Sequence, residues 1–221
     1  MSGLFERLKG DAAAAWSAYV EHDFVRGLGD GTLPEAAFRH YLVQDYLFLI
    51  EFARAYALGV SKAPTLADMR KSAGAMTGIL GEMSLHIRLC AGWGIDAAAL
   101  EAAPPARAML AYTSFVLEAG RRGDYLDLIV ALSPCVVGYA EIGTRLAARP
   151  HGRDPANPYA PWIAEYAGEA YQALAAEARA ELDRIGAVYL TEARYPRLAA
   201  LFAQATRLEA DFWQMGLDQA D

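Results

Sequence analysis

The fold is predicted from the stretch DYLDLIVALSPCVVGYAEIGTRLAA, residues 124–148. Asp124 is a good helix N-cap, and apolar residues recur at helical spacing from Tyr125 onward. The helix that this pattern predicts is apolar on too many sides for a surface position, so we place it in the middle of a helical bundle. Pro134 lies well inside it, at a cost of about 3 kcal/mol, and a kink of this kind usually has a cause.

Pro134 is followed by Cys135, one of only two cysteines in the chain, and Tyr139 lies one helical turn later on the same face. A thiol, a phenol and a bent backbone at one place predict a pocket. The alternative is a buried structural cysteine in an alanine-rich core, which is the more common situation of a lone cysteine.

The rest of the chain also shows helical periodicity, and no alternating strand pattern competes with it. Start signals of the capping-box kind stand at Thr32 and Thr65. Breaks are predicted at residues 27–31, at Gly186 and in a long loop over residues 149–158. The predicted helices cover residues 4–21, 32–62, 65–90, 106–119, 124–148, 159–185 and 191–217, with a short segment after Asp96. We therefore expect one all-α domain over residues 1–221.

Composition and charge restrict the classes of function. The chain is 55% hydrophobic and 21% charged, which suits a large buried core. Its net charge of -7 argues against a nucleic acid partner, because phosphate binding needs clustered Lys and Arg. No apolar run reaches the roughly 18 residues of a membrane span, and the first residues lack a secretory pattern. With two cysteines in unrelated surroundings, we expect no disulfide framework and a cytoplasmic location.

Two carboxylates stand in apolar helical surroundings. Asp45 is flanked at helical spacing by aromatic and aliphatic side chains, and Glu209 lies close to Phe212 and Trp213. Either could be a solvated residue at the edge of an apolar stripe, which is the usual position of Asp and Glu. If buried, each needs a partner, and near a cysteine and several tyrosines they would form a site that moves protons.

Six short motifs carry a family resemblance. In order, they are Trp16 with HDFV (22–25) and GDGTLP (29–34), Phe38 with YLVQDY (41–46), GEMSLH (81–86), YTSF (112–115), SPCVVGY (133–139) and EADFW (209–213). Together they resemble the TenA family, also called thiaminase II or aminopyrimidine aminohydrolase. Each motif alone is weak, but the set is fairly specific and spans almost the whole chain.

The resemblance implies an all-α, haem-oxygenase-like multi-helix bundle that, as is common in this family, forms a homotetramer. It also implies a hydrolase of thiamine salvage that acts on a small molecule, with no cofactor and no metal. The expected reaction converts 4-amino-5-aminomethyl-2-methylpyrimidine to 4-amino-5-hydroxymethyl-2-methylpyrimidine, with thiamine as a second candidate substrate.

The same resemblance assigns roles to individual residues. Cys135 is the nucleophile, Glu209 is the main acid/base, and Asp45 holds the aminopyrimidine edge. The residues that line the substrate ring are Tyr112, Tyr139, Tyr166 and Phe48. Phe48 stands where many relatives have tyrosine, and Val136-Val137 replaces bulkier residues, so the preferred substrate stays open.

Two other functions also stay open. The first is a metal- or haem-dependent oxidase on the same fold, because Glu82 and His86 are one turn apart, as in a metal-ligand pair, and His22 is a candidate axial haem ligand. The second is a non-catalytic regulatory protein that binds a pyrimidine. Bound iron or colour would favour the first, and ligand binding without turnover would favour the second.

Overall fold

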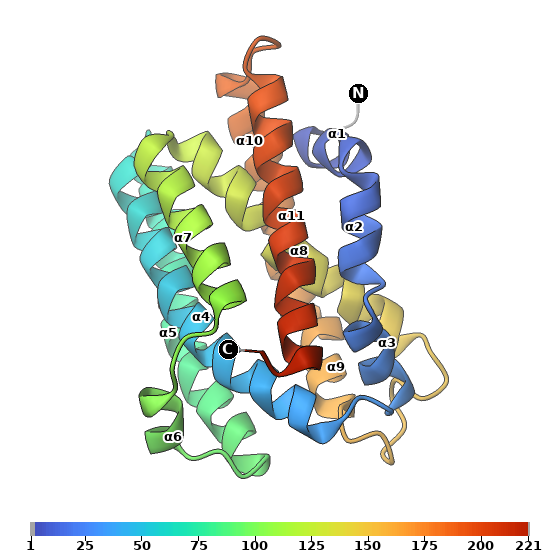
Figure 1. Cartoon of the computed structure of the whole chain (residues 1–221). Coiled ribbons are helices and arrows are strands. Elements are labelled where there is room, and N and C mark those ends of the chain that lie inside the picture. Colours follow the sequence, from blue (N-terminus) through green and yellow to red (C-terminus); the bar gives the residue numbers. More distant parts are fainter. Residues whose placement is uncertain (1–2, 221) are drawn as a thin grey trace. The chain divides into compact units, whose positions relative to one another are not determined.

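The structure is a computed structural model that describes residues 3–220, except for the side chains of Glu82 and Leu85. All regular secondary structure in this range is helical, and the prediction of an all-α fold is confirmed (Figure 1). The helices are α1 (Leu4–Asp11), α2 (Ala13–Val20), α3 (Asp23–Asp30), α4 (Glu35–Lys62), α5 (Leu66–Gly92), α6 (Ala97–Ala102), α7 (Arg107–Arg122), α8 (Tyr125–Ala147), α9 (Ala160–Ala167), α10 (Glu169–Tyr189) and α11 (Tyr195–Asp218).

The helices form two compact units. The first unit contains Met1–Pro34 and Val130–Gln214, and the second contains Glu35–Ile129 and Met215–Asp221. The boundaries fall inside α8 and α11, so each unit contains part of both long helices.

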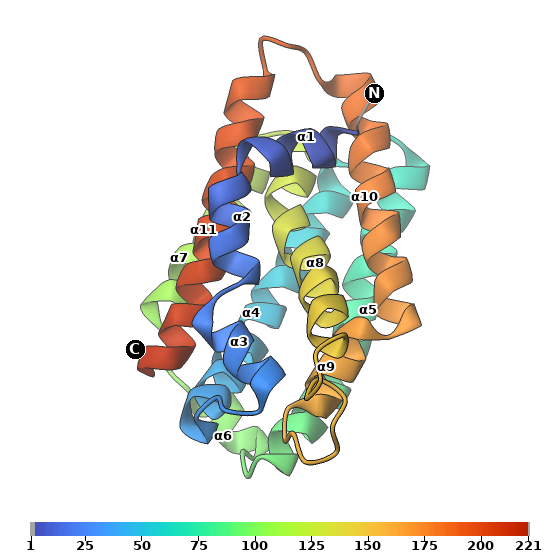
Figure 2. The same ribbon diagram turned by 90° about the vertical axis from the view of Figure 1, so that its right-hand side faces the viewer.

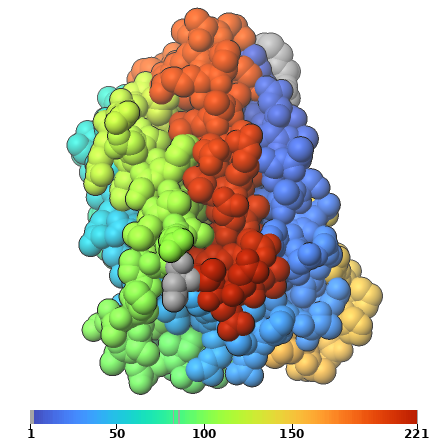
Figure 3. Space-filling model, viewed as in Figure 1, coloured from blue at the N-terminus to red at the C-terminus, as the bar shows by residue number. Residues whose placement is uncertain are grey.

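An aromatic core holds α1, α2 and α11 of the first unit together. The rings of Phe5 and Trp16 lie 5.7 Å apart, and they contact the ring of Phe202 at 5.8 Å and 5.9 Å. Helices α2 and α11 accordingly lie side by side (Figure 1, Figure 2 and Figure 3). The prediction of one helix over residues 4–21 is wrong, because the chain bends at Ala12. The bend lets Phe5 and Trp16 contact the same ring, that of Phe202. This contact is distant in the sequence, so the helix propensity of the alanines around residue 12 does not reveal it.

Gly186 is predicted to separate two helices, but it lies inside α10. A Cβ at this position would lie 2.6 Å from Cδ2 of Leu4, so the missing side chain makes room for α1 against α10. The predicted helix over residues 159–185 is interrupted at Gly168 instead, between α9 and α10.

The predicted break over residues 27–31 is also misplaced. Helix α3 runs through this glycine-rich segment and ends only at Gly31, whose φ of 70° lies in the left-handed region that glycine adopts at little cost. The predicted loop over residues 149–158 is confirmed, and Asn157 fastens it to the end of α3. The Nδ2 of Asn157 donates to the carbonyl of Leu28 at 2.9 Å.

Helix α4 is the centre of the second unit, where α5, α6 and α7 pack against it (Figure 1). The buried Gln44 of α4 fastens the segment that leads into α7. Its Nε2 donates to the carbonyl of Pro104 at 3.0 Å, and its Oε1 accepts from the backbone N–H of Ala106 at 2.9 Å. These two bonds set the position of α7, which carries Tyr112, along α4.

Side chains cap α5 and α8 at the predicted positions. Thr65 accepts from the backbone N–H of Asp68 at 3.2 Å, and its hydroxyl donates to the Asp68 carboxylate at 2.6 Å. At the start of α8, Asp124 and Asp127 each accept from the other's backbone N–H, at 3.1 Å and 2.9 Å. Both arrangements satisfy N–H groups that a helix start leaves without an intrahelical partner.

By length and composition alone, α8 could cross a membrane, but 89% of its most apolar window is buried inside the protein. This burial is typical of a core helix, which is the position that the sequence predicts for it.

Candidate functional site

The backbone around Pro134 is satisfied despite the missing N–H. In a regular helix, the carbonyl of Val130 would accept from the N–H of residue 134. Here it accepts from the hydroxyl of Ser133 at 2.9 Å, and α8 continues without interruption. The half-buried Cys135 follows directly and forms no disulfide. The cost of the proline is therefore partly offset, and the helix can present Cys135 from a regular position.

Tyr139 is the centre of an aromatic cluster in the first unit. Its ring centroid lies 4.9 Å from that of Tyr166, 5.3 Å from that of Trp213 and 5.9 Å from that of Trp162. Tyr139, Trp162 and Trp213 are buried and Tyr166 is half-buried. The two tyrosines that the sequence analysis assigns to ring contact in this unit are thus neighbours.

Tyr166 is held at the end of α9 by backbone contacts. The Nε2 of Gln172 donates to the carbonyl of Tyr166 at 2.7 Å and to that of Ala140 at 2.9 Å, which ties the end of α9 to α8. Gly143 of α8 allows this approach, because a Cβ there would lie 2.5 Å from the carbonyl carbon of Tyr166. A larger residue at position 143 would therefore displace Tyr166.

Glu209 of α11 is buried, with 2% of its surface exposed. It precedes Trp213 by four residues, as Cys135 precedes Tyr139, and residues four apart share a helix face. Helices α8 and α11 run in the same direction in the first unit (Figure 2). Tyr139 and Trp213 contact each other, and Cys135 and Glu209 each precede one of these two rings by one helical turn.

Asp45 of α4 is buried in the second unit and faces His86 of α5. The Oδ2 of Asp45 lies 3.6 Å from the Nδ1 of His86, and the Nε2 of His86 is hydrogen-bonded to the carbonyl of Leu42 at 3.0 Å. Burial raises the pKa of the Asp45 carboxyl above its ordinary value, while His86 and a hydrogen bond from Tyr41 act in the opposite direction. This carboxyl can therefore carry a proton at a higher pH than an exposed aspartate.

The second cysteine differs from Cys135 in its surroundings. Cys90 is fully buried, and burial together with the nearby Asp45 charge raises the pKa of its thiol to about 12. A thiol of this kind stays protonated and is a poor nucleophile. The geometry therefore agrees with Cys90 as a structural residue.

Phe48 and Tyr112 form a stacked pair between α4 and α7. Their ring centroids lie 5.1 Å apart at an interplanar angle of 29°, and the ring of Phe52 also stacks with that of Phe48, at 5.2 Å. Both members of the pair are buried. Two of the predicted ring-lining residues therefore touch each other in the second unit.

Comparison with known proteins gives the family. Residues 10–219 match the profile of the TENA/THI-4/PQQC family. The chain belongs to this family. A relative in Halalkalibacterium halodurans named aminopyrimidine aminohydrolase is 39% identical over 220 residues, which cover 99% of this chain and 95% of the relative.

Solved structures agree with the family. A protein of Silicibacter sp. TM1040, described as a TenA family transcription regulator, has a TM-score of 0.90 and 46% identity, over 98% of this chain and 97% of that one. A protein of Shewanella denitrificans with a heme oxygenase-like fold has a TM-score of 0.75 at 13% identity, over 97% and 92% of the two chains. The predicted haem-oxygenase-like fold is confirmed.

In this TENA/THI-4/PQQC protein, each unit carries part of the predicted set of site residues. The first unit contains Cys135, Tyr139, Tyr166 and Glu209, and the second contains Asp45, Phe48 and Tyr112. All seven residues lie in helices, on α4, α7, α8, α9 or α11. Their chemical roles stay predictions.

Sequence reasoning did not predict the contacts of three kinds of supporting residue in this family member. They are the ring partners Trp162 and Trp213, the backbone clamps Gln44 and Gln172, and the carboxylate partner His86. The sequence singled out Trp213 beside Glu209 and His86 as a candidate metal ligand, but nothing in it placed His86 opposite Asp45.

Two residues named for metal or haem chemistry have other contacts or lie outside the described part. The Nδ1 of His22 accepts from the backbone N–H of Phe24 at 3.2 Å, so His22 caps α3. The side chain of Glu82 lies outside the described residues, and the described ones contain no cluster of three metal-ligating side chains.

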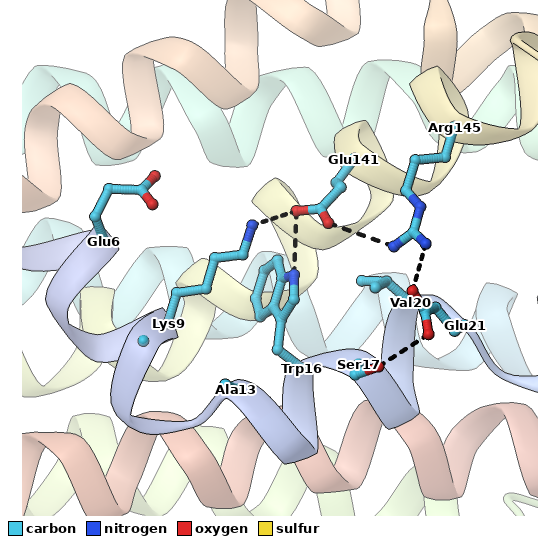
Figure 4. A pocket seen from close by; sticks show the side chains of 10 residues that line it. Glu6, Lys9, Ala13, Trp16, Ser17, Val20, Glu21, Glu141 and Arg145 are labelled. Carbon is cyan, nitrogen blue, oxygen red and sulfur yellow. Dashed lines mark hydrogen bonds and ion pairs between the residues drawn. The ribbon is translucent and has the colours of Figure 1, made fainter.

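A surface groove of about 370 Å³ lies over α1, α2 and α8 of the first unit (Figure 4). Its charged groups are already paired: Glu141 accepts from Lys9 at 2.6 Å and from the Trp16 indole at 3.1 Å, and Arg145 pairs with Glu21. None of the predicted site residues lines this groove.

Proposed function

We propose that this chain is an aminopyrimidine aminohydrolase of thiamine salvage. It converts 4-amino-5-aminomethyl-2-methylpyrimidine and water to 4-amino-5-hydroxymethyl-2-methylpyrimidine and ammonia, with thiamine as a second candidate substrate. The predicted enzyme class is confirmed by the relative of that name, which matches nearly the whole chain.

The observation that supports this reaction most strongly is the placement of Cys135 and Glu209. The nucleophile candidate and the acid/base candidate each lie one helical turn before a ring of the Tyr139–Trp213 contact, on α8 and α11. A thiol and a buried carboxyl are groups that can serve nucleophilic displacement on a ring.

The chemistry follows from this pair. The Cys135 thiolate adds to a ring carbon while Glu209 protonates a ring nitrogen, so the ring loses its aromaticity. The ring electrons then expel the protonated amine from the attached methylene as ammonia. Water adds to the methylene carbon and gives up a proton to the departing ammonia, the thiolate leaves, and the ring nitrogen returns its proton to Glu209, which restores the aromatic ring and both catalytic groups. One difficult displacement is thereby divided into easier steps.

Asp45 suits the recognition of an aminopyrimidine edge. A carboxylate oxygen accepts from the exocyclic amine, and a protonated oxygen donates to a ring nitrogen. The raised pKa of Asp45 favours the state in which it can do both. Tyr112 and Phe48 add flat aromatic surface in the same unit.

The working unit that we propose is the whole chain, residues 1–221, as a single TenA-like domain in the cytoplasm. Each of the two compact units contains some of the predicted site residues. We further propose a homotetramer of the 23.9 kDa chain, for which light scattering should give the mass of four chains.

A second candidate is a non-catalytic protein that binds a pyrimidine and regulates another process. The description of the Silicibacter relative as a transcription regulator favours it. The net charge of -7 argues against direct DNA binding, so such a protein would act through a partner.

Product analysis separates these candidates. Purified protein is incubated with the aminomethylpyrimidine and, in parallel, with thiamine, and the release of ammonia and hydroxymethylpyrimidine is followed. We expect catalytic turnover of the aminomethylpyrimidine, and the ratio of the two rates gives the preferred substrate. Tight pyrimidine binding without product from reduced protein would instead establish the binding function.

A further inference from the structure

We propose that His86 is a positioning residue: it shares one proton with Asp45 and thereby fixes which oxygen of Asp45 meets the substrate. This inference rests on the proposed function. His86 does not belong to the residues that the family resemblance assigns, and the observation behind it is the contact geometry in the second unit.

The contacts of the imidazole ring determine its tautomer. A backbone carbonyl only accepts hydrogen bonds, so the Nε2 that lies 3.0 Å from the carbonyl of Leu42 carries a hydrogen. In a neutral His86 the Nδ1 is then an acceptor. This nitrogen is the one that lies 3.6 Å from the Oδ2 of Asp45.

The pair therefore holds one proton, and sharing it requires Nδ1 and Oδ2 to approach from their 3.6 Å separation, which is longer than a hydrogen bond. A carboxylate opposite a neutral Nδ1 would place two lone pairs against each other in a buried position, where repulsion is not relieved by water. Either Asp45 is protonated and donates to Nδ1, or His86 is the cation and donates to Oδ2. In both states Oδ2 faces Nδ1 of His86, so we expect an exocyclic amine to meet Oδ1, in addition to the hydrogen bond that the carboxyl accepts from Tyr41.

The neighbouring groups of the second unit support this arrangement. Tyr41 donates to Asp45, and the ring of Tyr46 stacks on His86 with centroids 6.4 Å apart. The thiol of Cys90 interacts with the Asp45 charge, but its pKa of about 12 keeps it protonated. The shared proton therefore does not come from Cys90.

Two substitutions separate the functions of the two ring nitrogens. His86→Gln places an amide near the former Nε2, so it can keep the bond to Leu42 and loses the contact with Asp45. His86→Asn places an amide near the former Nδ1, so it can donate to Asp45 but cannot take up a proton. Thermal melts show whether both variants fold.

Steady-state kinetics with the aminomethylpyrimidine then test the role of His86. We expect His86→Gln to raise KM about tenfold or more, because Asp45 is no longer held in one orientation. His86→Asn should recover most of this loss. In both variants the pH profile of kcat/KM should shift by about one pH unit upward, because the charge that lowers the pKa of Asp45 is gone.

An exposed histidine provides the matched control. The Nδ1 of His151 lies 3.7 Å from Asp154 at the surface, so His151→Gln removes a similar pair without burial, and we expect wild-type kinetics. Wild-type KM and an unshifted pH profile in folded His86→Gln would overturn the proposal.

A second measurement does not depend on turnover. Nitrogen NMR of the ligand-free protein should show a protonated Nε2 in His86 and a Nδ1 signal displaced by the shared proton, and this displacement should vanish in Asp45→Ala. An unchanged Nδ1 signal would overturn the role of His86. If the wild type neither binds nor converts a pyrimidine, the proposed function fails, and the NMR result still decides whether the proton is shared.

Discussion

The rings of Tyr139 and Trp213 lie 5.3 Å apart, and each follows a predicted catalytic residue of its own helix by four positions. The ring contact joins α8 to α11 one helical turn after Cys135 and Glu209. The aromatic pair therefore links the two helices that carry the proposed nucleophile and acid/base.

Substitution of Glu209 tests its proposed role as acid/base. Glu209→Gln keeps the shape of the buried side chain but cannot exchange a proton. We expect kcat to fall by about 10²–10⁴-fold, the usual contribution of general acid–base catalysis. Ammonia release at saturating substrate measures it. The exposed Glu177→Gln serves as control, and a Glu209→Gln enzyme with the kcat of that control would contradict the role.

The close approach of α8 to the end of α9 predicts a contrast between two helix glycines. Gly143→Ala places a Cβ 2.5 Å from the backbone of Tyr166, and we expect a loss of about 1–3 kcal/mol from the free energy of unfolding together with a higher KM. At Gly74 nothing lies within 4 Å of an added Cβ, so Gly74→Ala should stabilise α5 by up to about 1 kcal/mol. Urea unfolding measures the free energy of unfolding of both variants. Equal changes in this free energy would contradict the close contact at Gly143.

Phe48 allows a test of substrate contact in the second unit. Phe48 stands where many members of the family have tyrosine, so we expect Phe48→Tyr to add a polar contact and raise kcat/KM for the aminomethylpyrimidine up to about tenfold. Phe52→Tyr is the matched control, because the ring of Phe52 stacks directly with that of Phe48. If Phe52→Tyr raised kcat/KM equally, the effect would not come from a contact at position 48.

The buried Asp45 predicts a specific dependence of stability on pH. Its pKa is raised in the folded state by burial, so the folded protein keeps a proton that the unfolded chain releases above about pH 3.9. The stabilising contribution of this proton is complete below that pH and is lost as the pH rises through the folded pKa.

Asp45→Asn isolates this contribution, because its amide does not titrate. The difference in unfolding free energy between wild type and Asp45→Asn, measured from about pH 4 to about pH 8, should fall as the pH rises. A difference that stays constant over this range would show that Asp45 titrates as an exposed aspartate does.

The start of a helix was predictable where a side chain close in the sequence caps it. The starts at Asp124 and Thr65 follow from side-chain caps that any chain with these residues can form. The bend at Ala12 and the position of Gly186 inside α10 were not predictable, because both depend on side chains distant in the sequence, such as Leu4 against Gly186. Local propensity contains no information on such contacts.

The same division holds for the candidate site. Cys135, Asp45 and Glu209 stand out in the sequence as polar or reactive residues in apolar helices. Their partners did not stand out: His86 is separated from Asp45 by 41 positions, and only the packing of α5 on α4 brings the two together. The candidate residues could therefore be recognised from residue types and the family resemblance, while the residues that pack against them required the fold.

The most direct test of the central claim is the turnover of the aminomethylpyrimidine by Cys135→Ser. We expect ammonia release to fall at least about a thousandfold relative to wild type, because a serine hydroxyl is a far weaker nucleophile toward the ring. Cys90→Ala, which removes the buried second thiol, should retain turnover. Activity of Cys135→Ser within about tenfold of the wild type, with the loss falling on Cys90→Ala or on neither variant, would contradict Cys135 as the nucleophile.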